Sequence, residues 1–120
     1  MSDDRIREKY LGSRLPDVEC FIVQTDGQDA GLAILHVEPD GGGIDLILLP
    51  EARGHGVGRA AVAELVQRAR TQRGWSRITV DPDRANESGI RFWRSVGFVP
   101  DCVVGDGPSR QPYLVMSRTT

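Results

Sequence analysis

Three glycines alternate in the segment Arg53-Gly54-His55-Gly56-Val57-Gly58, between an apolar run at residues 44–49 and a helical pattern that begins at Val57. Glycines leave backbone N–H groups uncovered, and the first N–H groups of a helix lie at the positive end of the helix dipole. Such a loop binds phosphate groups. Glycines also simply form sharp turns, because Gly adopts positive φ without strain. The strand before the loop and the helix after it favour the anion-binding interpretation.

Two histidines are candidates for acid–base chemistry, because imidazole changes its charge near neutral pH. His36 lies in an apolar strand pattern, which favours a structural role. His55 lies in the glycine loop, where we expect it to face solvent or a phosphate. Neither has a serine or cysteine partner at triad-like positions, so no catalytic role is assigned to them.

Composition restricts the class of protein. The 120 residues make one domain that spans residues 1–120. The net charge of −2 shows no basic surplus for nucleic acid. Cys20 and Cys102 lie in apolar runs and are expected to be buried thiols, with no metal site. No apolar run approaches the ~20 residues of a membrane span and the start has no signal-peptide pattern, so a cytoplasmic location without membrane contact is expected.

The first half of the chain predicts an antiparallel meander. A short helix is expected over residues 3–12, followed by strands at residues 18–24, 30–37 and 44–49. The Asp26-Gly27 pair indicates a hairpin turn between the first two of these strands, and residues 38–43 have the composition of a loop.

In the second half of the chain, the spacing of the apolar residues changes from that of strands to that of a helix. Residues 57–74 predict an amphipathic helix that ends at Gly74, and residues 77–80 predict a strand parallel to the strand at 44–49. A second helix at 86–96, extended segments at 98–99 and 102–104, and a strand at 113–116 complete the chain. The fold class is mixed α/β (α+β), with an antiparallel first half, a parallel joint and the order α-β-β-β-α-β-α-β-β.

Two motifs resemble those of one family. Arg53-x-x-Gly56-x-Gly58 after an apolar strand resembles the acetyl-coenzyme A signature of the GNAT N-acetyltransferases. Asn86-x-x-Gly89, continuing to Gly97-Phe98, resembles their second signature. Within the superfamily, the sequence looks most like the aminoglycoside 6′-N-acetyltransferase branch. Family members begin with another strand and helix, so this resemblance implies a GNAT-like sheet that is shortened at its N-terminus and lacks one wall of the acceptor site.

The resemblance implies acetyl-CoA as cosubstrate and assigns its contacts. The pantetheine arm would pair with the backbone of the strand around residues 46–48, and the pyrophosphate would lie on the backbone amides of residues 54–59. Asn86 would bind the pantetheine region. The asparagine is equally well explained as the N-cap of the following helix. The implied cofactor-binding residues are Leu46, Ile47, Leu48, Arg53, Gly54, His55, Gly56, Val57, Gly58, Arg59 and Asn86.

The resemblance also implies transfer of an acetyl group to a primary amine of a small, polycationic acceptor. The attacking amine must lose a proton, and Asp45 matches the aspartate proposed as base in the aminoglycoside branch. Glu51 is the other nearby candidate for the base. The non-catalytic explanation is that Asp45 is a polar residue on the solvated face of an alternating strand. Trp93 occupies the position of a family tyrosine that protonates the thiolate; tryptophan cannot do so, which favours a core role.

Two other functions also fit parts of this sequence. Gly56-x-Gly58-x-x-Ala61 also matches a dinucleotide fingerprint, with Asp81 in the place of a ribose-binding acid, but the predicted meander does not open with parallel βαβ units. A non-catalytic, shortened GNAT-like module that binds coenzyme A or a protein partner is the second alternative. In either GNAT-like case, the expected lack of N-terminal elements predicts a homodimer or a hetero-partner that covers the gap.

Overall fold

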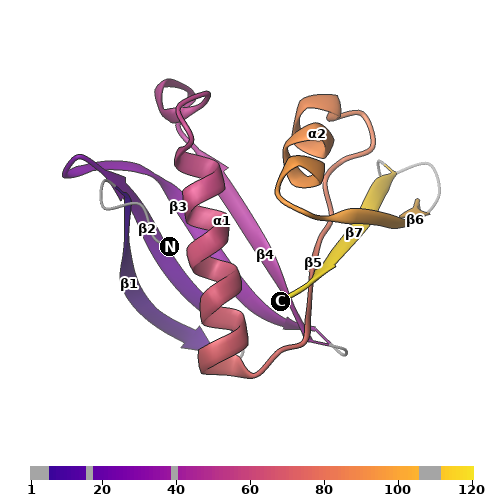
Figure 1. Cartoon of the computed structure of the whole chain (residues 1–120), viewed down its shortest axis with the longest axis horizontal. Coiled ribbons are helices and arrows are strands. Elements are labelled where there is room, and N and C mark those ends of the chain that lie inside the picture. Colours follow the sequence, from indigo (N-terminus) through magenta and orange to yellow (C-terminus); the bar gives the residue numbers. More distant parts are fainter. Residues whose placement is uncertain (1–5, 16–17, 39–40, 106–111) are drawn as a thin grey trace.

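The computed structural model describes residues 6–15, 18–38, 41–105 and 112–120 (Figure 1). In these residues seven strands form one sheet in the order β1-β2-β3-β4-β5-β7-β6. The strands are β1 (Ile6–Leu15), β2 (Val18–Thr25), β3 (Gln28–Glu38), β4 (Gly41–Leu48), β5 (Arg77–Val80), β6 (Val99–Val104) and β7 (Tyr113–Thr119). The helices are the 3-10 turn η1 (Pro50–Ala52), α1 (Val57–Arg68), the π-helical turn η2 (Ala69–Arg73) and α2 (Glu87–Ser95).

The antiparallel meander and the mixed α+β fold are confirmed. β2 pairs with β3 and β3 with β4, both antiparallel. The turn between β2 and β3 has positive φ at both central residues, 52° at Asp26 and 79° at Gly27, which matches the twist of the flanking strands. The predicted Asp-Gly hairpin is therefore correct.

The predicted helix over residues 3–12 is wrong. Residues 1–5 lie outside the described part of the chain, and Ile6–Leu15 form β1, which pairs antiparallel with β2. The helix prediction depended on apolar residues spaced by four, and a spacing of four is close to one helical turn but is also two strand periods. Backbone pairing with β2 decides between the two.

The predicted loop at residues 38–43 was also too long. Gly41, Gly42 and Gly43 belong to β4, where they oppose Glu38, Val37 and His36 of β3. Their lack of side chains serves close contacts rather than a turn. A Cβ at Gly42 would lie 2.1 Å from the ring of Trp75, and one at Gly43 would lie 2.4 Å from the ring of His36.

The predicted parallel joint is confirmed, and it is short. β4 and β5 pair parallel through Gly42 with Ile78 and Gly43 with Thr79, the two pairs given by the described residues. Beyond Gly43 the two strands diverge. In Figure 1 they lie close together at the bottom and separate toward the top. β5 instead pairs along its length with β7. From Ile44 to Leu48, the edge of β4 that faces β5 no longer pairs with it, so the sheet is open at its middle there.

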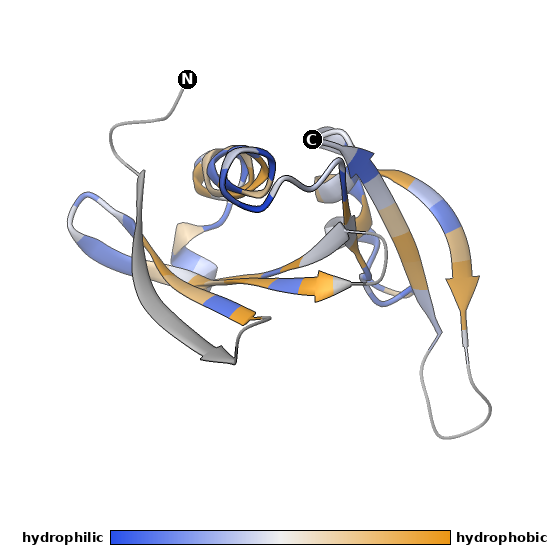
Figure 2. Cartoon of the chain, turned by 90° about the horizontal axis from the view of Figure 1, so that it is seen from below, coloured by the Kyte–Doolittle hydropathy of each residue, from blue (hydrophilic) through white to orange (hydrophobic). Residues whose placement is uncertain are grey.

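The main core lies between α1 and one face of the first-half strands (Figure 2). Ala61, Val62 and Leu65 of α1 are buried there against Leu35 of β3 and Ile44 of β4. Because side chains alternate along a strand, the neighbours of these strand residues lie on the opposite face. No described helix covers that face in Figure 2.

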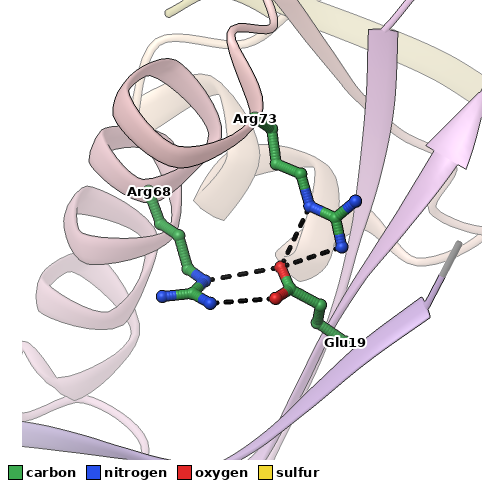
Figure 3. A network of polar contacts seen from close by, with 3 residues as sticks. All are labelled: Glu19, Arg68 and Arg73. Carbon is green, nitrogen blue, oxygen red and sulfur yellow. Dashed lines mark hydrogen bonds and ion pairs between the residues drawn. The ribbon is translucent and has the colours of Figure 1, made fainter. Parts of the chain in front are cut away.

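Among the side chains that the structure describes, one carboxylate is buried in this otherwise apolar layer. Glu19 of β2 is 7% exposed and accepts hydrogen bonds from two arginines (Figure 3). Arg68 donates from Nη2 to Oε1 over 2.9 Å, and Arg73 donates from Nε to Oε2 over 3.1 Å. The hydrogen bond from Arg68 is the main cause that lowers the pKa of Glu19, against a smaller opposing effect of burial.

The π-helical turn explains how both arginines reach one carboxylate. In an α-helix, residues five apart point in directions about 140° apart. A π turn brings such residues closer to the same side, because its hydrogen bonds run to the fifth residue. The predicted end of this helix at Gly74 is confirmed, where φ is 69°. Arg68 and Arg73 also lie over Phe21 and Trp75, at 5.1 and 5.7 Å from the ring centroids.

We expect Glu19→Gln to lower the free energy of unfolding at pH 7 by about 1.5–3 kcal/mol, the usual contribution of hydrogen bonds to a charged group. The difference in the free energy of unfolding between this variant and wild type should disappear at acidic pH. The folded pKa lies below the ordinary 4.5, so the unfolded chain takes up the proton first as the pH falls. The stabilisation is thus complete above about pH 4.5 and is lost as the pH falls through the lowered pKa. Urea unfolding between pH 3 and pH 7 measures this.

Glu64→Gln is the control, since Glu64 lies on α1 and loses the same charge. Its effect should stay within about 0.5 kcal/mol, as for most surface changes. Equal losses in both variants, or a difference at Glu19 that does not change with pH, would contradict the role given to the buried carboxylate.

Candidate functional site

The glycine loop follows β4 and leads directly into α1, as predicted. Gly54 and Gly56 have φ values of 78° and 80°, and Gly56 is the N-cap of α1. A Cβ at either position would have no atom within 4 Å. Gly58 differs, because a Cβ there would lie 3.0 Å from the ring of Phe92. Two glycines therefore set the backbone of the loop, and the third lets α2 pack closely on α1.

Two arginines hold this loop against its neighbours. Arg53 donates from Nε and Nη2 to the carbonyl oxygen of Leu48, over 3.2 and 3.1 Å. Arg59 donates from Nη2 to the carbonyl oxygen of Ser95 over 3.2 Å. The first contact fixes the loop to the end of β4, and the second fixes the start of α1 to the end of α2. His55 is exposed in the loop between them, in agreement with the expectation from sequence.

The N-cap explanation of Asn86 is correct. Its Oδ1 accepts a hydrogen bond from the backbone N–H of Gly89 over 3.0 Å, at the start of α2. The side chain leaves no room for a Cβ at Gly89, which would lie 2.4 Å from Asn86 Nδ2. Asn86 is exposed, and a contact with pantetheine stays a prediction.

The core interpretation of the aromatic residues is confirmed for Trp93 and Phe98. Trp93 is 8% exposed and packs edge-on against Phe92 and Phe98, with ring centroids 5.0 and 5.2 Å apart. Phe98 is fully buried, and Phe92 packs against the same core. Trp93 thus anchors α2 in the core.

The structure brings the candidate base Asp45 beside His36, whose apolar strand pattern had favoured a structural role. His36 Nε2 on β3 lies 3.4 Å from Asp45 Oδ2 on β4. Asp45 follows the buried Ile44, so it lies on the face of the sheet away from α1. Glu51, the rival base, is exposed in η1 beyond the end of β4. The contact was not foreseeable from the two residues alone, because they are nine positions apart in the chain.

The expectation that both cysteines are buried thiols is wrong, because Cys102 is exposed on β6 and Cys20 is half-buried on β2. Both are free thiols. Alternation places Cys20 on the sheet face away from α1, and β6 is an edge strand. In the described ranges no group of three or more His, Cys, Asp or Glu side chains is arranged to hold a metal ion. None of the helices there has the length and apolar character that a membrane span requires.

The sequence profile of the Acetyltransferase (GNAT) family matches residues 2–98. The chain belongs to this family. Members use acetyl-CoA as cosubstrate. A comparison with curated proteins returned no match.

Solved structures share the fold. The spermidine N-acetyltransferase SpeG N152L mutant from Vibrio cholerae superposes with a TM-score of 0.78 at 17% identity, covering 88% of this chain and 66% of that one. SpeG in complex with CoA and spermine gives a TM-score of 0.75 at 17% identity, with 87% and 66% covered. The spermidine N-acetyltransferase SpeG R149-K152 chimera from Vibrio cholerae and hSSAT gives a TM-score of 0.79 at 17% identity, with 88% and 68% covered. The chain thus spans about two thirds of the length of these proteins.

The glycine loop yields a test that separates backbone strain from ligand binding. Gly56→Ala and Gly74→Ala both force alanine into a left-handed conformation, with φ of 80° and 69°, so each should lose about 1–2 kcal/mol of stability. Only Gly56→Ala should also weaken acetyl-CoA binding, by about tenfold, because only Gly56 precedes the N–H groups at the start of α1. Isothermal titration with each variant measures this.

Gly74→Ala is the matched control. If the two variants bind acetyl-CoA with equal affinity, or if Gly56→Ala binds it as tightly as wild type does, the loop is not part of the binding site.

Proposed function

We propose that this chain is an acetyl-CoA-dependent N-acetyltransferase that acetylates a primary amine of a small polycation. The observation that carries the proposal is the glycine loop at the start of α1, beside the place where β4 leaves β5. Membership of the GNAT family supports the same cosubstrate. The loop backbone has open space around Gly54 and Gly56, which suits the close approach of a pyrophosphate.

The contacts with acetyl-CoA follow from this arrangement. The amides of residues 54–59 would hold the pyrophosphate at the positive end of the α1 dipole. The backbone of Leu46, Ile47 and Leu48 would pair with the pantetheine arm, since β5 has diverged from that part of β4. Arg53 donates hydrogen bonds to the Leu48 carbonyl oxygen, so the arm and Arg53 would share this end of the strand.

The chemistry requires one proton acceptor. An ammonium group gives its proton to the carboxylate of Asp45, and the neutral nitrogen attacks the thioester carbonyl. A C–N bond forms and the C–S bond breaks, the acylated nitrogen loses its second proton to solvent, and the coenzyme A thiolate takes a proton from solvent. A thiolate is a tolerable leaving group, because thiols ordinarily have a pKa near ~8.5. The reaction therefore does not require an acid at the position of Trp93.

The acceptor class is proposed from charge and fold together. Asp45 and Glu51 place two exposed carboxylates at either end of the divergent part of β4, which favours cationic acceptors. Polyamines and aminoglycosides are both polycations with primary amines. Similarity to SpeG, solved with CoA and spermine, favours polyamines, and the resemblance to the aminoglycoside branch favours the other class. A homodimer or a hetero-partner stays part of the proposal.

A thiol-release assay with acetyl-CoA tests the function. Spermidine, spermine and an aminoglycoside are compared with an amino sugar that carries a single amine. Saturable release with at least one polycation, and little with the monoamine sugar, is the expected result because of the two carboxylates. Tight binding of acetyl-CoA without release for any amine would instead support the non-catalytic module.

Asp45→Asn should lower kcat by about a hundredfold or more, the usual contribution of a general base. The affinity for acetyl-CoA should stay within about twofold, because the side chain lies on the sheet face and the cofactor is proposed to use backbone groups. Initial rates at saturating acetyl-CoA measure this.

Asp26→Asn is the matched control, since asparagine tolerates the left-handed conformation of that turn residue. Undiminished turnover in Asp45→Asn, together with a loss in Glu51→Gln, would move the role of base to Glu51.

A further inference from the structure

We propose that His36 is a positioning residue for this reaction, which holds the Asp45 carboxylate in the orientation that accepts the proton of the acceptor ammonium. The inference rests on the function proposed above and goes one residue beyond it. It assigns a role to a histidine that lies on another strand and outside both family signatures.

The first observation is the contact itself. His36 Nε2 lies 3.4 Å from Asp45 Oδ2, within ion-pair distance. The side chains are 29% and 51% exposed, so the imidazole is the more enclosed of the two and the carboxylate is the more open. An anchored ring beside an open carboxylate is the arrangement in which the ring can restrict the carboxylate while solvent or a ligand still reaches it.

The second observation is the register of β3 and β4. His36 lies opposite Gly43, and Asp45 lies opposite Ile34, so the two side chains are diagonal neighbours on one face. The imidazole reaches Asp45 by lying across Gly43. A Cβ at Gly43 would be 2.4 Å from Cε1 and 2.7 Å from Nε2 of the ring, which is closer than carbon atoms approach. Glycine at this position therefore makes the contact possible.

The third observation is the place of the pair in the sheet. Gly43 is the last residue of β4 that pairs with β5, and Asp45 is two residues further along the strand. The carboxylate that His36 contacts thus lies where β4 begins to open on its β5 side. A short aspartate on an uncovered face has several accessible rotamers, and a neighbouring imidazole that favours one of them lowers the entropy that the reaction must otherwise lose.

Kinetics of three variants test the role. His36→Leu removes the polar ring, His36→Gln keeps an N–H donor, and Gly43→Ala keeps both groups but pushes the ring away from Asp45. With the best amine from the acceptor assay, kcat should fall by about 10- to 100-fold in His36→Leu and Gly43→Ala, as for a displaced catalytic group. The fall should be smaller in His36→Gln, and the KM for acetyl-CoA should stay within about twofold in all three.

Ile34→Val is the control for packing, because Ile34 is the cross-strand neighbour of Asp45 and carries no hydrogen-bonding group. Its kcat should match that of wild type. A structural role for His36 predicts the opposite pattern, with a lower melting temperature in His36→Leu and an unchanged kcat, and that result would overturn the proposal. An unchanged kcat in Gly43→Ala would do the same, since this variant leaves both ionisable groups in place.

A spectroscopic measurement keeps the test independent of turnover. At a pH where histidine is neutral, ¹⁵N–¹H correlation spectra should show His36 with its proton on Nε2, facing the carboxylate, and the His36 Nε2 signal should shift in Asp45→Ala. The chain has two histidines, and the loss of signals in His36→Gln assigns them. Absence of the proton on Nε2 in wild type would overturn the contact. If wild type shows the proton on Nε2 but acetylates no amine, the proposed reaction is wrong, and the role of His36 in it is wrong as well. The contact between His36 and Asp45 would still stand.

Discussion

A buried carboxylate constrains how the helix layer lies on the sheet. Glu19 is ionised inside the layer between β2 and α1, and such a charge is strongly unfavourable unless it is paired and hydrogen-bonded. Its partners, Arg68 and Arg73, come from the last turn of α1 and from η2. The helix can therefore take few rotations or translations along the strands without leaving a buried charge unpaired. Apolar packing alone would tolerate more of them, because it is not directional.

That constraint acts at a distance through the stiffness of α1. Twelve residues of α-helix span about 18 Å, so fixing one end determines where the other end lies. At the far end, the loop is held by Arg53 on the Leu48 carbonyl, by Arg59 on the Ser95 carbonyl and by the contact of Gly58 with Phe92. The N–H groups at the start of the helix consequently lie beside the open part of β4. The candidate cofactor loop is placed by long-range contacts, although its own conformation is local.

Glycines illustrate how differently one residue type is used. Gly27, Gly54, Gly56 and Gly74 have positive φ, and their neighbours in sequence predict a turn or a helix end. Gly42 and Gly43 lie in an ordinary strand, where Trp75 and His36 cover them, and composition alone misassigns them to a loop. The predicted elements with local start and stop signals, such as α2 between Asn86 and Gly97, were located to within a residue or two. The helix predicted at residues 3–12 had weak signals and was wrong.

The amino-acid sequence by itself determined the features whose causes lie within a few residues: the Asp-Gly hairpin, the glycine loop at the start of a helix, the cap of α2, and two signatures that indicate the family. Only the tertiary structure decided whether residues 6–15 form a strand, where β4 leaves β5, and which groups meet across strands. Glu19 finds Arg68 and Arg73 about fifty positions away, and His36 meets Asp45 through the register of β3 and β4. The reason is physical: a spacing along the chain is read from local periodicity, whereas a contact across a sheet depends on backbone pairing and on the space that a glycine leaves open.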